Sequence, residues 1–415
     1  MSLALPDTRI DADRLWGSLM SMAAIGATAR GGCNRQALTD EDKAGRDLFA
    51  QWAREAGCTV AVDEVGNMFA ARRGSETAAA PVLIGSHLDT QPTGGRFDGV
   101  YGVMAGLEVV RTLNDHGIRT RRPIEVASWT NEEGCRFVPA MLGSAVVAGK
   151  YDLDYAYGRT DKSGRTFGAE LQRIGYRGTL PARARAFRAM FEAHIEQGPI
   201  LEQAGTTIGV VTGIQGLHWL DVTLEGQAAH AGPTPMEMRR DPWRAACPII
   251  DAATAIANAN APWGRATIGD LKVIPGSRNT VPERLVIAVD LRHPDGATLE
   301  TMLGAFREQV QSAAARHRIR AEVTPVWYMP PTRFDGALIE LIDSAAAQLG
   351  YSRRRMVSGA GHDSLNTAQF APTAMIFVPC VGGLSHNEAE DATPGDLASG
   401  ANVLLQAVAA AANDP

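Results

Sequence analysis

The chain has 415 residues, which at about 150 residues per domain predicts two or three domains. Its hydrophobic fraction of 45% and charged fraction of 21% are typical of a globular protein with a sizeable core, and they exclude the disordered and fibrous classes. A net charge of −6 without any block of Lys or Arg argues against binding to nucleic acid or to an anionic membrane.

Residues 1–212 alternate helical and strand patterns. Acidic residues at the start and a glycine at the end predict a helix over 40–57. Short apolar runs at 82–85, 124–128 and 189–193 predict buried strands, and apolar residues at helical spacing predict a helix over 100–113. The segment 157–165, rich in Asp, Gly and Arg, is expected to be a surface loop. This succession indicates an α/β layer domain.

Residues 213–329 follow another pattern, which predicts a separate small domain. Strands are expected at 218–226, 266–274, 284–292 and 320–327, with helices at 241–259 and 298–316. Pro248 should kink the first of these helices or mark a break in it. The order β-α-β-β-α-β is that of the split βαβ or ferredoxin-like arrangement.

After Pro330 and Pro331 the first pattern resumes. Helices are predicted at 336–349 and 396–411, and a buried strand at 373–378. The larger domain is therefore expected to be discontinuous, formed by residues 1–212 and 330–415.

The beginning of the chain and its cysteines predict a cytoplasmic protein. The first 17 residues carry three Asp and no apolar run after a basic start, so no signal peptide is expected. No run of about 18 apolar residues occurs, so no membrane span is expected. The odd number of cysteines and their scatter argue against a disulfide framework or a zinc knuckle: Cys33, Cys58, Cys135, Cys247 and Cys380.

Several catalytic signatures are absent from the sequence, namely the Gly-x-Ser-x-Gly elbow, the P-loop and the His-Glu-x-x-His helix. Candidate metal ligands instead occur in five dispersed clusters, four of which directly follow a predicted strand. Open α/β sheets bind ligands at the carboxyl ends of their strands. The clusters contain His87 and Asp89, Asp98, Glu132 and Glu133, His194, and His386.

Each cluster taken alone has an ordinary structural interpretation. A single His at a strand end is more often hydrogen-bonded than metal-bound, adjacent glutamates are usually solvated, and Asp before Gly is common in turns. Their recurrence at strand ends favours a metal site. Mixed nitrogen and oxygen ligands suit Zn²⁺, Mn²⁺, Ni²⁺ or Co²⁺ rather than Ca²⁺.

The motifs resemble those of the M20 metallopeptidase superfamily. GSHLDT at 85–90 with GGRFDG at 94–99 resembles its metal-binding opening. NEEGCRF at 131–137, HIEQGP at 194–199 and AHAGPTPM at 229–236 resemble the narrower amidase/hydantoinase/carbamoylase branch. Members of this branch include N-carbamoyl-L-amino acid hydrolases, bacterial-type β-ureidopropionases and allantoate amidohydrolases. The similarity extends from about residue 10 to the C-terminus.

The resemblance implies a zinc-peptidase-like catalytic domain that binds two divalent metal ions, Zn²⁺, Mn²⁺, Co²⁺ or Ni²⁺. An inserted ferredoxin-like domain would serve as a lid and as the homodimer interface. The ligand roles it implies divide between the two ions. His87 and His194 would bind one metal, Glu133 and His386 the other, and Asp98 would bridge both.

The resemblance also implies the catalytic groups. Glu132 would be the general base rather than a ligand, because one carboxylate of the pair must stay free to take a proton. Asp89 would be the carboxylate that orients the His87 ring. His230, in the lid, would stabilise the oxyanion, and it can be supplied across the dimer.

Substrate-binding residues follow from the same resemblance. Arg292 would bind the substrate carboxylate, as a guanidinium group suits bidentate recognition of that group. Asn279 and Gln197 would lie beside it. Gly359 and Ala360 match a loop of small residues that offers backbone groups to the substrate.

The expected activity is hydrolysis of the carbamoyl C–N bond of a small N-carbamoyl amino acid or ureido acid, releasing ammonia, carbon dioxide and the amino acid. Allantoate is an alternative substrate, and a less favoured alternative is an M20 aminoacylase or dipeptidase. A non-catalytic scaffold that kept the fold is disfavoured, because all five ligand candidates and the base are present.

Overall fold

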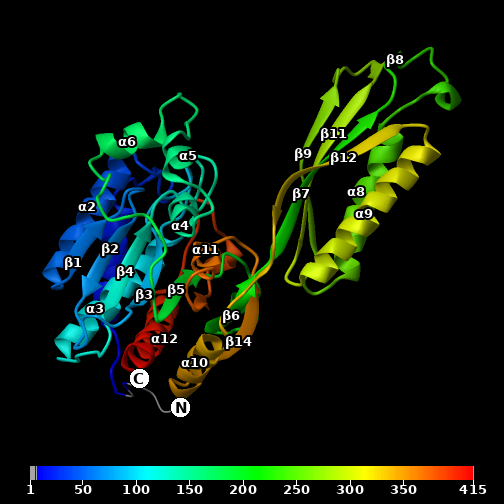
Figure 1. Ribbon diagram of the computed structural model, residues 1–415. Helices are drawn as coiled ribbons and strands as arrows, with labels where there is room; N and C mark the ends of the chain where they lie inside the picture. The colour runs from blue at the N-terminus through cyan, green and yellow to red at the C-terminus, as the bar shows by residue number, and fades with distance from the viewer. Residues whose placement is uncertain (1–4, 6, 415) are drawn as a thin grey trace. The chain divides into compact units, whose positions relative to one another are not determined.

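The structure is a computed structural model that describes residues 5 and 7–414 (Figure 1). The chain divides into two compact units. The first unit comprises Met1–Thr212 and Phe334–Pro415, and the second unit comprises Gly213–Arg333. The catalytic role of the first and the lid role of the second stay predictions.

The first unit is built on a mixed sheet whose four central strands are parallel and fully buried. A strand covered on both faces needs apolar residues on both, which explains why apolar residues predominate in these strands. Glu125 in β4 and Glu192 in β5 are buried acidic exceptions. The strands follow the order β1 (Thr59–Val62), β2 (Met68–Arg72), β4 (Ile124–Trp129), β3 (Val82–His87), β5 (Ala189–Ile195), β15 (Thr373–Val378) and β6 (Ile208–Ile214), with β14 (Arg353–Ser358) also paired to β6. The last strand of the sheet, β13 (Thr332–Arg333), pairs with β6 at the boundary where the chain returns from the second unit.

Long helices pack on this sheet. α3 (Val100–Asp115) and α12 (Pro394–Asn413) contact the central strands, and α1 (Ala12–Ala23) and α10 (Gly336–Gln348) pack beside α12 (Figure 1). α2 (Asp40–Glu55) begins where the Thr39 side chain accepts the N–H of Asp42, and the chain turns away at Gly57, whose φ is +79°. Shorter helices are α4 (Leu142–Val147), α5 (Leu153–Tyr157), α6 (Phe167–Arg173), α7 (Ile200–Gln203), α11 (Ser364–Thr367) and the 3₁₀ turn η2 (Val381–Gly383).

The predicted α/β layer class is confirmed, and the predicted strands of the first unit are present. Three of them run further than the apolar pattern indicates, so that β3, β4 and β5 include His87, Trp129 and Ile195. The sequence analysis did not predict the sheet margin formed by β1, β2, β6 and β14.

The second unit is a four-stranded antiparallel sheet with two helices packed on it (Figure 1). Its chain order confirms the predicted ferredoxin-like arrangement, and its core includes Val222, Ile287 and Phe306. The strand order is β12 (Arg320–Met329), β7 (Gly216–Glu225), β11 (Arg284–His293) and β9 (Arg265–Ile274), and the helices are α8 (Trp243–Ala259) and α9 (Gly296–Arg316). The ribbon of β8 (Ala229–His230) and β10 (Thr280–Val281) and the turn η1 (Met236–Met238) were not predicted.

Pro248 does not break α8, which is continuous from Trp243 to Ala259. Its ring removes one backbone hydrogen bond near the start of the helix. Ala245, Ala246 and Ile249 are buried in the core of the second unit, so tertiary packing keeps the helix intact around the proline.

Within the part of the chain that the structure describes, no helix combines the length and the apolar character needed to cross a membrane.

Candidate metal centre

The five predicted metal ligands lie together in the first unit. His87 is the last residue of β3, and His194 lies near the end of the neighbouring parallel strand β5. Their ring centroids are 6.2 Å apart. Asp98 precedes α3, Glu133 follows β4, and His386 follows η2. Parallel strands therefore bring residues that are far apart in the sequence to one edge of the sheet.

Two groups of potential ligands share Asp98. Its Oδ1 lies 3.7 Å from His87 Nε2 and 3.2 Å from His194 Nε2. Its Oδ2 lies 3.4 Å from His386 Nε2, which is also 3.4 Å from Glu133 Oε2. Within each group the ligand atoms all lie within 4.8 Å of one another. One carboxylate thus directs one oxygen to each group, which is the geometry of a bridging ligand.

Backbone carbonyls orient the two buried imidazoles. His87 donates from Nδ1 to the carbonyl of Asp89 at 2.9 Å, and His194 donates from Nδ1 to the carbonyl of Ile195 at 2.8 Å. The Nε2 atoms are thereby directed toward Asp98. Such contacts fix the tautomer and the ring plane of a metal-binding histidine.

Asp89 acts differently from the prediction. Its carboxylate accepts the backbone N–H groups of Glu132 and Glu133, each at 3.2 Å, and its Oδ1 is 3.9 Å from His87 Nδ1. The carboxylate therefore anchors the Glu132–Glu133 segment, and the group that orients the His87 ring is the carbonyl of Asp89. The predicted contact between carboxylate and ring is wrong because the backbone, not the side chain, comes within hydrogen-bond distance.

The two adjacent glutamates have different surroundings. Glu133 belongs to the second ligand group, and Gln91 holds it by its backbone N–H at 3.2 Å and by Nε2 at 2.7 Å. Glu132 belongs to neither group, and its Oε2 lies 3.5 Å from His87 Nε2. Both side chains are nearly buried, so each has few water molecules to stabilise its charge.

The electrostatics of this cluster favour a bound cation. Burial, together with the charge of Asp98, raises the pKa of Glu133 to about 8. Burial, then the charges of Asp363 and Glu133, raise the pKa of Glu132 well above its usual range. Burial lowers the pKa of His87 to about 4, so its imidazole is neutral, the form that binds metal. Against the effect of burial, the hydrogen bond to Asp98 raises the pKa of His194 to about 9, and the hydrogen bond to Asp98 likewise raises the pKa of His386 to about 9, so both would release a proton on binding metal. Closely spaced buried carboxylates with imidazoles are a donor set that fits divalent metal ions.

Gly99 provides the space for the His87 ring. Its φ is +68°, and a Cβ at this position would lie 2.2 Å from His87 Nε2. Its N–H donates to His194 Nε2 at 3.1 Å. No other residue type could occupy this position without moving the ring of His87.

Three of the predicted substrate-binding residues lie in the first unit. Gln197 donates from Nε2 to Asp98 Oδ2 at 2.9 Å, and its buried Oε1 has no hydrogen-bond partner among the described residues. Gly359 and Ala360 follow β14, where the N–H of Ala360 donates to Ser358 Oγ at 3.1 Å.

The other predicted residues lie in the second unit. His230 ends β8, and Asn279 directly precedes β10, where its carbonyl accepts the N–H of Ala231 at 2.9 Å. Arg292 lies on β11 and forms an ion pair with Asp290 at 2.7 Å. A carboxylate that binds Arg292 must therefore compete with Asp290.

The structure adds residues that the sequence analysis missed. Glu390 and Ser385 contact the Asp98 segment, and Glu192 and His362 lie within ligand distance of His194. Their signals were weak. Glu390 lies only four residues beyond His386, and His362 lies within a near match to a glycine-rich phosphate loop.

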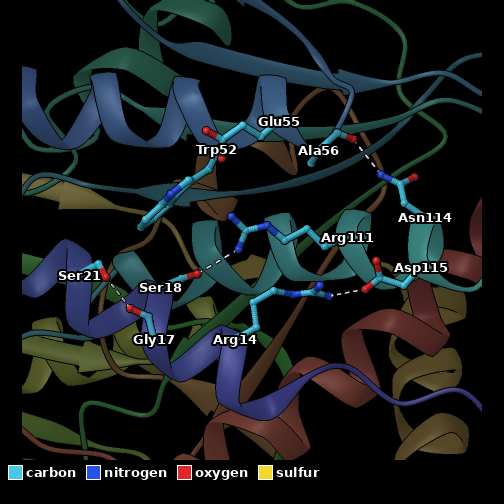
Figure 2. A pocket seen from close by; sticks show the side chains of 10 residues that line it. All are labelled: Arg14, Gly17, Ser18, Ser21, Trp52, Glu55, Ala56, Arg111, Asn114 and Asp115. Atoms are coloured by element: carbon cyan, nitrogen blue, oxygen red, sulfur yellow. Dashed lines mark hydrogen bonds and ion pairs between the residues drawn. The ribbon is translucent and has the colours of Figure 1, made fainter.

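A cavity of about 580 Å³ lies among α1, α2 and α3. Figure 2 shows the side chains that line it. Arg111 spans it, donating to Ser18 Oγ at 2.9 Å with its guanidinium over the ring of Trp52. The cavity reaches Asp115 at the end of α3, whereas the candidate ligands surround Gly99 before its start. None of its ten lining residues is a predicted site residue, so the site is identified by its ligand atoms.

The model of the peptidase family M20/M25/M40 matches residues 83–410. The chain belongs to this family, which confirms the resemblance seen in the motifs. The matched segment contains all five candidate ligands.

Relatives of known name cover nearly the whole chain. An N-carbamoyl-L-amino-acid amidohydrolase of Rhizobium meliloti is 51% identical over 96% of this chain and 96% of its own length. A ureidoglycolate hydrolase of Arabidopsis thaliana is 32% identical over 95% of this chain and 85% of its own. A crystal structure of a hydantoinase/carbamoylase family amidase from Burkholderia multivorans has a TM-score of 0.96 and 54% identity, covering 98% of this chain and 99% of that one. The narrower resemblance to the amidase/hydantoinase/carbamoylase branch is thereby confirmed.

Proposed function

We propose that this chain is a dinuclear metal-dependent hydrolase that cleaves the carbamoyl C–N bond of an N-carbamoyl amino acid. Its products would be ammonia, carbon dioxide and the free amino acid. The observation that carries the proposal is Asp98, which directs one oxygen to each of two ligand groups. The identity of 51% with the Rhizobium meliloti enzyme supports the choice of substrate class.

The residues at the centre support a division of labour in the reaction. Divalent metal ions in such a site make a water molecule more acidic and polarise the substrate carbonyl. Glu132 lies beside His87 but outside both ligand groups, so its carboxylate is available to take the proton of the attacking water and to give it to the leaving nitrogen. Glu133, held by Gln91, would remain a ligand.

The residues predicted from the family resemblance would bind the substrate. Arg292 would hold the carboxylate after exchanging its pairing with Asp290. The unpartnered amide oxygen of Gln197 can accept a hydrogen bond from a substrate N–H group. Asn279 and the loop of Gly359 and Ala360 would complete the site, and His230 would donate to the developing oxyanion.

We propose further that the enzyme is a homodimer through its second unit and works in the cytoplasm. Trp219 and Trp327 contact each other on this unit, with ring centroids 4.9 Å apart, and are 41% and 39% exposed. Exposed aromatic clusters of this kind are typical of protein interfaces. All five cysteines are free thiols, which supports a reducing compartment.

The decisive experiment measures ammonia release by metal-free protein supplied with Mn²⁺, Co²⁺, Ni²⁺ or Zn²⁺. The substrates are N-carbamoyl-L-amino acids, N-carbamoyl-β-alanine and allantoate, with release of the amino acid from N-acetyl amino acids as a parallel assay. We expect metal-dependent turnover of N-carbamoyl-L-amino acids. Turnover without metal would contradict the dinuclear mechanism.

The remaining substrates distinguish the alternatives. The Arabidopsis thaliana relative favours a ureido acid as the second candidate, which preferential turnover of allantoate would support. Preferential cleavage of N-acetyl amino acids would instead indicate an aminoacylase.

A further inference from the structure

The segment that carries Asp98 is joined to the segment that carries His386 by one buried carboxylate. The two segments are almost three hundred residues apart in the chain. Glu390, which is 1% exposed, accepts the backbone N–H groups of Phe97 and Asp98 through Oε1 at 2.9 and 3.1 Å. Two adjacent backbone donors on one oxygen fix both the position and the direction of the chain at Asp98.

The second oxygen of Glu390 acts on the Asp98 side chain through a serine. Oε2 lies 2.9 Å from Ser385 Oγ, and the same hydroxyl lies 3.0 Å from Asp98 Oδ2. Ser385 directly precedes His386. The contacts of Glu390 therefore reach both the backbone and the carboxylate of Asp98, and also the residue next to another candidate ligand.

The surroundings of Glu390 are shaped to receive it. A Cβ at Gly95 would lie 2.0 Å from the carboxyl carbon and from Oε1 of Glu390. Gly95 does not have a positive φ, so its backbone would accept a side chain and only the space is restricted. Next to this contact, Arg96 and Asp391 form an ion pair at 2.8 Å that joins the same two segments.

We propose that Glu390 is a positioning residue that holds Asp98 in the bridging orientation between the two ligand groups. Without Glu390, the backbone N–H groups of Phe97 and Asp98 and the Ser385 hydroxyl lose the carboxylate that they contact. Because Asp98 contributes to both groups, loss of Glu390 weakens the binding of both metal ions. The inference rests on the dinuclear site proposed above, and no proton transfer is assigned to Glu390.

The test is calorimetric titration of Mn²⁺ into metal-free protein, with thermal melting of the metal-free protein to check its fold. Loss of a residue that supports a metal ligand typically weakens affinity 10–100-fold. We expect Glu390→Ala to bind Mn²⁺ about tenfold or more weakly while the metal-free protein still unfolds in one cooperative transition, at a lower melting temperature because two buried N–H groups lose their acceptor. Glu390→Gln should restore affinity, because its amide oxygen can accept both N–H groups and its NH₂ can donate to Ser385 Oγ.

Gly95→Ala tests the same contact from the other side. Its methyl group would push the carboxylate away, so this variant should lose affinity as Glu390→Ala does. In the double variant the clash is gone, so Gly95→Ala should cause no further loss once Glu390→Ala is present. Gly269→Ala, in a position with no atom within 4 Å of the added Cβ, is the matched control and should bind like the parent protein.

The outcomes separate this inference from the proposed function. Parent-like affinity in Glu390→Ala would overturn the positioning role, and so would affinity in Glu390→Gln as weak as in Glu390→Ala. If Glu390→Ala does not fold, the test relies on Gly95→Ala. Parent-like Mn²⁺ affinity in Gly95→Ala would also overturn the positioning role of Glu390. A parent protein that binds no Mn²⁺, Co²⁺, Ni²⁺ or Zn²⁺ would instead contradict the dinuclear site itself.

Discussion

At the scale of single residues, two adjacent glutamates have different surroundings, and this difference assigns them different proposed roles. Glu132 and Glu133 are neighbours in the chain, and Asp89 holds the backbone N–H group of each. Their side chains nevertheless differ, because Gln91 contacts only Glu133. Because Gln91 holds the carboxylate of Glu133, we propose that the carboxylate of Glu132 is the one available for proton transfer.

Glu132→Gln is expected to keep metal binding and lose most turnover. Glutamine has the same size but cannot accept a proton, and general acid–base catalysis typically contributes about 10²- to 10⁴-fold. Steady-state turnover and metal content are measured on the same preparation. Glu133→Gln is the comparison variant and should lose metal instead. The opposite pattern would show that the two roles are reversed.

Arg292→Ala is expected to lower kcat/KM for a substrate with a free carboxylate. The corresponding loss of transition-state stabilisation is about 1.5–3 kcal/mol, the contribution of a charge-assisted hydrogen bond. The loss should be small for the same substrate with its carboxylate capped as an amide. Kinetic measurements on both substrates check this. Asp290→Asn removes the competing charge and should lower KM for the carboxylate substrate. Equal losses on both substrates in Arg292→Ala would indicate a purely structural role.

At the scale of elements, the sheet and one helix start position the centre. β3 and β5 present His87 and His194 side by side because they are adjacent and parallel. α3 begins directly after Gly99, and Asp98 precedes this glycine. The geometry of the centre therefore depends on a backbone conformation at the start of α3 that glycine adopts readily.

Gly99→Ala is expected to abolish metal binding, since its Cβ would lie 2.2 Å from His87 Nε2. Gly117 provides a matched control near the other end of α3. Its φ is +61°, and no atom lies within 4 Å of an added Cβ. Gly117→Ala should lower stability by about 1–2 kcal/mol through backbone strain alone and keep its metal. Metal content and chemical denaturation of both variants test this, and full metal content in Gly99→Ala would contradict it.

At the scale of the whole molecule, the five candidate ligands belong to the first unit, whereas His230, Asn279 and Arg292 belong to the second. Each unit has its own buried core. The proposed metal ligands thus belong to the first unit alone, whereas the proposed substrate-binding residues are divided between the two units, and this division leads to two tests.

Removal of metal by a chelator is expected to lower the melting temperature of the protein. A ligand that binds only the folded state stabilises it by about 4 kcal/mol when present at 1,000 times its Kd. The melting temperature should rise again with the concentration of added Mn²⁺, as calorimetry can measure. A melting temperature that does not depend on metal would argue against ligands fixed by the fold.

If His230 serves the partner's site, two inactive variants should complement each other. Removing an oxyanion-hole donor typically costs about 10²- to 10³-fold in turnover, so His230→Ala and Glu132→Gln should each be nearly inactive. After full subunit exchange, half of the dimers are mixed and each has one intact site, so about a quarter of parent activity should return. Confirmed exchange without any return of activity would assign His230 to its own subunit.

How much the sequence predicts differs between the core and the margins. The short, mostly apolar runs of β3, β4, β5 and β15 identify central strands, because burial on both faces favours apolar residues at successive positions. Short marginal strands such as β1 and β14 are largely exposed and were not predicted. Of the two effects predicted for Pro248, the break does not occur, because packing of Ala245 and Ile249 outweighs the loss of one hydrogen bond.

The sequence by itself determined the family, the ferredoxin-like insertion and the identities of the five candidate ligands, because long ordered motifs record the chemistry that must be present. Only the tertiary structure decided which atoms of these residues lie within contact distance of one another. It showed that Asp98 directs its oxygens to two ligand groups, that the backbone of Asp89 orients His87, and that Glu390 reaches the Asp98 segment. These facts depend on distances between residues far apart in the chain, and a linear pattern contains no such distances.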